Sequence, residues 1–119
     1  MSISSYKELE AYKKSYCLVK DVYRFTERFP KTELYGMTNQ IRRAAISVPL
    51  NISEGYMRGP KEYVQFLKIA LGSAAEVETL LTLGKDLKFL SEKDFDAAFN
   101  LNLDAIKLIR TYIKRLANY

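Results

Sequence analysis

The chain has 119 residues, of which 48% are hydrophobic and 28% charged, a composition that suits one folded domain and excludes disorder. Five glycines and three prolines are too few for the many turns of a β-sandwich or barrel, so we expect an all-α protein. The absence of histidine and the single cysteine exclude an intrachain disulfide and argue against the usual zinc and iron sites. The net charge of +5 favours an anionic partner, for which nucleic acid is the most abundant candidate in a cell.

The first helix is predicted over residues 6–28, with Ser4 or Ser5 as its cap and Pro30 just beyond its end. Its apolar residues form two stripes, which predicts contacts with more than one neighbouring helix. Cys17 lies on this helix, and we expect a buried, inert thiol rather than a reactive one.

The second helix is predicted to begin after Thr32 or Thr38 and to end near Tyr56. It contains residues 40–55, QIRRAAISVPLNISEG, where an apolar stripe runs beside a polar stripe at helical spacing. Pro49 removes one helical hydrogen bond and should kink the helix. We expect Ser47 or Asn51 to satisfy the groups that the kink frees.

The third helix is predicted to begin at Pro60 and to weaken near Gly84, and the fourth to follow a Ser91 cap and reach the C-terminus. Four helices of about 20 residues joined by short connections are typical of an up-down-up-down bundle. The predicted fold is therefore all-α, a single antiparallel four-helix-bundle domain over residues 1–119.

The polar stripe is interpreted as an architectural network that fixes how helices or subunits pack, with Arg43 expected to pair with Glu76 across the second and third helices. A catalytic or ligand site is the alternative, but no nucleophile or metal set supports it. We therefore predict no catalytic, cofactor-binding or metal-binding residue. The predicted network consists of Gln40, Arg43, Ser47, Asn51, Glu54, Ser73 and Glu76.

Basic side chains that share helix faces or lie near helix ends are candidates for contacts with nucleic-acid phosphates, although solvated helix faces would show the same pattern. The candidates are Lys13, Lys20, Arg24, Arg28, Arg42, Arg58, Lys61, Lys107, Arg110 and Lys114. The nine tyrosines can stack on unpaired bases, but protein interfaces also favour tyrosine, and for this bundle the interface interpretation is stronger.

No apolar run approaches the roughly 20 residues that span a bilayer, and the first residues lack the apolar core of a signal peptide. From these two absences we expect a cytoplasmic protein.

Two long runs, residues 40–59 (QIRRAAISVPLNISEGYMRG) and 62–81 (EYVQFLKIALGSAAEVETLL), resemble proteins encoded within intervening sequences of bacterial 23S ribosomal RNA genes. The chain is also similar to the accessory variability determinant of diversity-generating retroelements. The resemblance implies a four-helix bundle that assembles as a homopentamer without enzymatic activity. In the retroelement relatives, it implies a basic barrel that binds nucleic acid and associates with a reverse transcriptase.

These observations together predict a non-enzymatic homo-oligomer that binds structured RNA or DNA electrostatically. The alternative is a protein-interaction scaffold with no direct nucleic-acid role, for example an accessory subunit of a nucleic-acid enzyme such as a reverse transcriptase.

Overall fold

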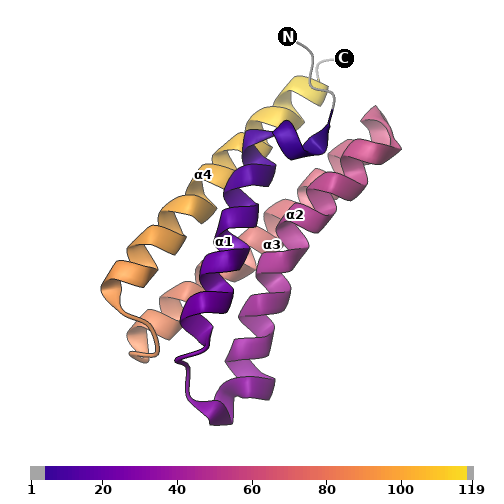
Figure 1. The fold of residues 1–119 in the computed structure, drawn as a ribbon. Helices are drawn as coiled ribbons and strands as arrows, with labels where there is room; N and C mark the ends of the chain where they lie inside the picture. The colour runs from indigo at the N-terminus through magenta and orange to yellow at the C-terminus, as the bar shows by residue number, and fades with distance from the viewer. Residues whose placement is uncertain (1–4, 118–119) are drawn as a thin grey trace.

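Four long helices make up the fold in a computed structural model that describes residues 5–117. The helices are α1 (Glu10–Thr26), α2 (Asn39–Arg58), α3 (Pro60–Asp86) and α4 (Glu92–Ala117), and no strand occurs within the described residues (Figure 1). The prediction of an all-helical domain with four helices is therefore confirmed. The molecule is elongated, with extents of 47 × 24 × 21 Å.

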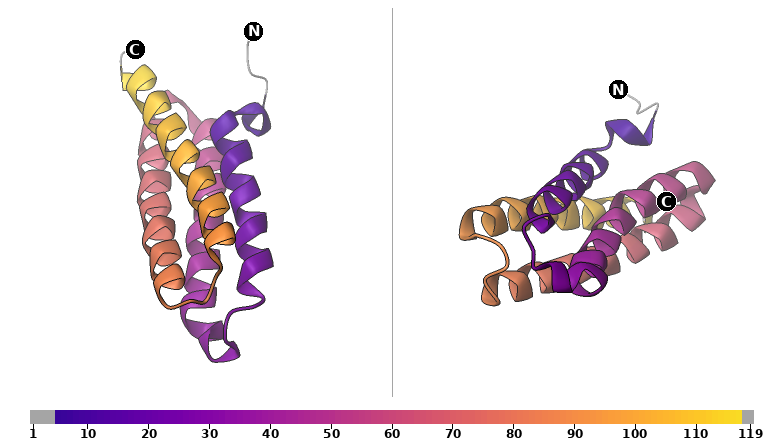
Figure 2. Two further views of the ribbon diagram at one scale, coloured as in Figure 1. Left: turned by 90° about the vertical axis from the view of Figure 1, so that its left-hand side faces the viewer. Right: turned by 60° about the horizontal axis from the view of Figure 1, so that its bottom comes forward.

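Each helix packs against two others, so that α1, α2, α3 and α4 form a closed ring in chain order (Figure 2). The end of α1 contacts the start of α4, because Arg28 bonds to Asp94 at 3.0 Å. Near the opposite end, the Ala11 N–H donates to the Tyr112 hydroxyl at 3.4 Å. The start of α1 and the end of α4 accordingly lie at one end of the bundle (Figure 1).

The first helix begins later than predicted. Residues Tyr6–Glu8 form a short 3₁₀ helix, η1, and Leu9 then adopts extended dihedral angles before α1 starts at Glu10. Ser5 caps η1 by accepting a hydrogen bond from the Lys7 N–H at 3.1 Å, whereas Ser4 lies outside the described residues. The extended Leu9 therefore separates the predicted single helix into two.

The connection between α1 and α2 contains a 3₁₀ turn, η2 (Lys31–Glu33), and a π-helical turn, η3 (Leu34–Thr38). The predicted threonine cap of α2 is wrong, because Thr38 already has helical dihedral angles and makes no capping bond. The Glu33 carboxylate acts as the cap of η3 instead and accepts from the Met37 N–H at 3.1 Å.

α2 continues through Pro49, and the expected compensation for the lost hydrogen bond differs from the prediction. Proline at position 49 leaves the Ala45 carbonyl without its helical donor. The Asn51 side-chain amide donates to the Ser47 carbonyl at 2.7 Å rather than to that of Ala45. Asn51 therefore ties one turn of α2 together without replacing the missing bond.

Two helix starts follow the sequence prediction. Pro60 is the first residue of α3, and the Ser91 hydroxyl caps α4 by accepting from the Asp94 N–H at 3.1 Å. A single residue, Gly59, separates α2 from α3. Its dihedral angles, φ 158° and ψ 167°, belong to a region that essentially only glycine adopts, which explains how one residue reverses the chain.

The core consists of two apolar clusters stacked along the bundle axis. One contains Phe25, Ile41 and Leu81, and the other contains Ile52, Leu67 and Ile109. Asn102 is also buried, and its amide donates to the Ala74 carbonyl at 2.9 Å.

Cys17 is exposed, so the prediction of a buried thiol is wrong. It follows the exposed Tyr16 and precedes the buried Leu18. Because each helical residue turns the side chain by about 100°, Cys17 points away from the core-facing stripe to which Leu18 belongs.

Candidate nucleic-acid interface

A groove between α2 and α3 gathers most of the predicted polar stripe. It has a volume of about 430 Å³, and we call it the polar groove. Its lining consists of Tyr35, Gly36, Asn39, Gln40, Arg43, Ala44, Ser47, Ser73 and Glu76. Five of the seven residues of the predicted network therefore meet at one place on the surface.

Among the residues that the structure describes, one hydrogen bond of this stripe joins the two helices, and it lies in the deeper part of the groove. The Ser73 hydroxyl donates to the Ser47 hydroxyl oxygen at 2.8 Å, and the Asn51 amide donates to the same oxygen at 2.9 Å. The Ser47–Ser73 bond joins α2 to α3 and holds the floor of the polar groove together. Ser47 and Ser73 thus join the two helices, whereas the bonds of Asn51 stay within α2.

The expected Arg43–Glu76 ion pair does not form among the described residues, where the seven ion pairs involve other side chains. Both residues are exposed at the outer edge of the polar groove. An exposed pair gains at most about 1 kcal/mol and must immobilise two long side chains, so proximity of the two helices alone does not enforce pairing. Arg43 and Glu76 are therefore open to external partners.

Glu54 has an intrahelical partner instead of a place in the network. Its carboxylate accepts from Arg58 Nε at 3.1 Å, and the Arg58 guanidinium also lies 5.0 Å from the centre of the Phe66 ring. Arg58 was a candidate for phosphate contacts, but these two contacts hold it against its own bundle.

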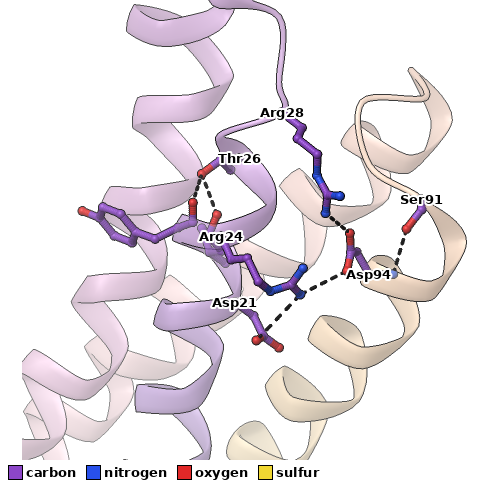
Figure 3. A network of polar contacts seen from close by, with 8 residues as sticks. Asp21, Arg24, Thr26, Arg28, Ser91 and Asp94 are labelled. Atoms are coloured by element: carbon purple, nitrogen blue, oxygen red, sulfur yellow. Dashed lines mark hydrogen bonds and ion pairs between the residues drawn. The ribbon is translucent and has the colours of Figure 1, made fainter.

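The basic residues of α1 are largely neutralised by acidic neighbours. Arg24 and Arg28 both bond to the Asp94 carboxylate at 3.0 Å, and Arg24 also lies 3.9 Å from Asp21 (Figure 3). Lys13 pairs with Glu10 at 3.3 Å. Arg24 and Arg28 therefore join α1 and the turn after it to α4, and all three candidates offer little uncompensated charge.

Two further candidates make contacts with aromatic rings. Arg42 Nε donates to the Thr26 hydroxyl at 2.9 Å, and its guanidinium lies 4.5 Å from the Tyr23 ring centre. Lys20 Nζ lies 5.5 Å from the Tyr16 ring centre. Arg42 is thereby anchored between α1 and α2, whereas Lys20 remains at the exposed surface.

The remaining candidates lie on α3 and α4 and are not paired with acidic side chains in the described residues. Lys107, Arg110 and Lys114 are exposed and spaced by three and four residues, so they share a face of α4. We call the following set the cationic surface: Lys61, Lys68, Lys107, Arg110 and Lys114. Within residues 5–117, none of these five side chains has an ion-pair partner.

The contacts of α3 show which way Lys68 points. Phe66 and Ser73 face α2, since an added Cβ at Gly55 would meet Phe66 and since Ser73 bonds to Ser47. Lys68 is rotated about 200° from Phe66 and about 140° from Ser73, which directs it away from α2. The sequence prediction did not include Lys68, because the helical periodicity of the polar stripe pointed to α2.

Acidic residues are scarce on this part of the molecule. After Asp104 the sequence contains no Asp or Glu, and between Pro60 and Ala75 the only acid is Glu62. Lys61 lies in the first turn of α3, where a positive charge opposes the helix dipole. Helix stability therefore does not account for a lysine at that position.

An apolar face lies along α1 and α2. Tyr16, Leu50 and Met57 are 50%, 59% and 71% exposed, and a shallow pocket of about 180 Å³ opens between the two helices. Large apolar side chains that gather on a surface typically mark a contact with another protein.

Burial raises the pKa of the Tyr63 hydroxyl to about 12, and nearby Tyr112 and Tyr56 contribute to the rise. Burial likewise raises the pKa of Tyr12, with Tyr6 and Tyr16 as further causes. Both hydroxyls therefore stay neutral well above physiological pH.

No group of three His, Cys, Asp or Glu side chains is placed to hold a metal ion between residues 5 and 117. In the same range, no helix is both long and apolar enough to cross a membrane.

The fold and these surfaces define a small four-helix protein with a cationic surface and a polar groove. The chain belongs to the 23S rRNA-intervening sequence protein family, whose model matches residues 7–111. The fold is similar to that of a protein of unknown function from the S23 ribosomal protein family of Bacteroides thetaiotaomicron VPI-5482, with a TM-score of 0.78 and 24% identity. That match covers 87% of this chain and 98% of the other chain. No curated protein matches the chain.

Proposed function

We propose that this protein is a non-enzymatic, cytoplasmic nucleic-acid-binding protein that holds structured RNA or DNA through its cationic surface. The observation that carries the proposal is the set of five exposed cations on α3 and α4 without an ion-pair partner in residues 5–117. Such cations contact phosphates and release condensed counterions, which gives affinity without sequence readout.

The expected salt dependence follows from the number of phosphate contacts. Five contacts per protomer correspond to a slope of log K against log salt of about −4.5 on duplex DNA. The assay measures the affinity for a structured RNA hairpin and for a DNA duplex over a salt series. Absence of binding at low salt, or binding that salt does not weaken, would refute the proposal.

Charge reversal locates the binding surface. The variant Lys107→Glu/Arg110→Glu/Lys114→Glu should make the slope of log K against log salt less steep by about three units, because each lost phosphate contact removes about one unit. It should also weaken binding to all sequences similarly. The three side chains are exposed, so the variant should remain folded.

The matched control reverses three exposed lysines at the other end of the bundle and changes the net charge by the same amount. Its substitutions are Lys31→Glu, Lys88→Glu and Lys93→Glu. The control should bind almost as tightly as the parent protein. Equal losses in both variants would show that overall charge, and not the cationic surface, governs binding.

We propose further that the protein is a homo-oligomer, and the resemblance to the retroelement accessory proteins implies a pentamer of antiparallel bundles. The exposed Tyr16, Leu50 and Met57 on the apolar face support a contact between copies. Leu50→Glu should lower the mass measured in solution by light scattering. A parent protein that is monomeric at micromolar concentration would refute the assembly.

The second candidate function is a protein-interaction scaffold, for example an accessory subunit of a reverse transcriptase. The same apolar face favours it, because its side chains suit a protein partner better than phosphates. In that case, the charge-reversal variant of the cationic surface would leave the partner interaction intact.

A further inference from the structure

The polar groove holds two opposite charges that do not neutralise each other. Arg43 and Glu76 both line it, and neither has an ion-pair partner within the described residues. A ligand that fills the groove must therefore offer hydrogen-bond donors to the Glu76 carboxylate and acceptors to the Arg43 guanidinium.

The groove also offers neutral groups for hydrogen bonding. Asn39 and Gln40 line it, and each side-chain amide both donates and accepts. Beneath them, the hydrogen bond between Ser47 and Ser73 fixes the distance between α2 and α3. The groove is therefore a preformed polar site with mixed donor and acceptor character.

An exposed aromatic ring lies at the rim. Tyr35 lines the groove and is 92% exposed, and no other ring or cation within residues 5–117 packs on it. A free tyrosine ring is a surface on which a nucleobase can stack, worth about 1–3 kcal/mol per base.

We propose that the polar groove binds an unpaired guanine base of the nucleic acid, an inference that rests on the proposed nucleic-acid-binding function and deepens it. Guanine carries two adjacent donors, N1–H and N2–H₂, which together fit one carboxylate. Its O6 and N7 acceptors fit an arginine or an amide. Glu76 takes the donor edge, Arg43 and Gln40 take the acceptors, and Tyr35 stacks on the ring.

The other bases fit this arrangement less well. Adenine and cytosine each present one amino group beside a ring acceptor, and uracil presents one N–H between two carbonyls. None of them places two adjacent donors against the Glu76 carboxylate. Unpaired bases in loops and bulges expose these edges, so the site suits single-stranded segments of a structured RNA.

The experiment titrates the intact chain with guanosine 5′-monophosphate and, separately, adenosine 5′-monophosphate and follows backbone amide shifts by NMR. We expect the guanine nucleotide to shift groove residues and to bind at least about tenfold more tightly than the adenine nucleotide. Glu76→Gln should reduce this preference to about twofold or less. The control Glu78→Gln changes an exposed carboxylate of the same helix outside the groove and should keep the preference.

The outcomes separate this inference from the proposed function. Equal affinity for the two nucleotides, or a preference that survives Glu76→Gln, overturns guanine recognition. If the protein still binds RNA through the cationic surface in a salt-dependent way, the proposed function holds without guanine recognition. If RNA does not bind at any salt concentration, the proposed function fails, and the guanine nucleotide titration still decides whether the groove recognises the base.

Discussion

Replacing Gly55 by alanine tests how closely α2 and α3 approach each other. An added Cβ would lie 2.6 Å from Phe66 Cβ and 3.3 Å from Tyr63 Cα, whereas ordinary carbon contacts are about 3.5–4.0 Å. Both neighbouring atoms belong to or adjoin the backbone of α3, so a change of rotamer cannot relieve the clash. The two helices must move apart, at a cost of about 1–3 kcal/mol.

Gly72 supplies the matched control. It also lies inside a helix, but an added Cβ there would meet nothing within 4 Å. Gly72→Ala should therefore stabilise the protein by about 0.8–1.0 kcal/mol through helix propensity alone. Because Gly55→Ala receives the same gain, the difference in unfolding free energy between the two variants isolates the clash.

The assay is urea unfolding of both variants, followed by circular dichroism. Gly55→Ala should be less stable than Gly72→Ala by about 1–3 kcal/mol. Equal stability of the two variants would show that α2 and α3 are not in close contact at Gly55 and would refute the packing argument.

Two further outcomes concern ionisable groups. Asp94→Asn should destabilise the protein by about 1–2 kcal/mol at low salt, since it removes the charge partner of Arg24 and Arg28. Because salt screens charges, urea unfolding at about 1 M salt should show a smaller loss of stability. A loss that is the same at both salt concentrations would contradict the electrostatic origin. The raised pKa of Tyr63, about 12, means that the folded state favours the neutral hydroxyl over the ionised one. The stability that the neutral Tyr63 hydroxyl contributes is therefore complete below about pH 10 and is lost as pH rises toward 12. Tyr63→Phe should flatten the stability curve over that range, and an unchanged curve would assign the alkaline loss to other groups.

Helix identity and several boundaries could be predicted because they depend on local chemistry. Pro60 starts α3 and Ser91 caps α4 through groups within one turn of chain. The start of α2 could not be predicted in this way, because a Glu33 carboxylate caps the turn before it in place of a threonine. Periodicity likewise placed the polar stripe correctly on one face but could not show whether two exposed charges on adjacent helices would pair.

The candidate phosphate-binding residues show the limit of sequence patterns more clearly. Arg24 and Arg28 share a helix face with the pattern of a binding surface, but the Asp94 that neutralises them is 70 and 66 residues away in the chain. Only the three-dimensional arrangement distinguishes them from Lys107 and Arg110. Lys68 could have been found from the scarcity of acids in its part of the sequence.

The single-residue link at Gly59 limits how the chain can change in length. Inserting one helical residue there would turn α3 by about 100° relative to α2 and carry Ser73 away from Ser47. The connection between α1 and α2, residues 27–38, is longer, and its exposed Lys31 and Thr32 lie between the buried Phe29 and Met37. Domain insertions or affinity tags are therefore better placed at Lys31 and Thr32, whereas residue 59 sets the rotation of α3 relative to α2.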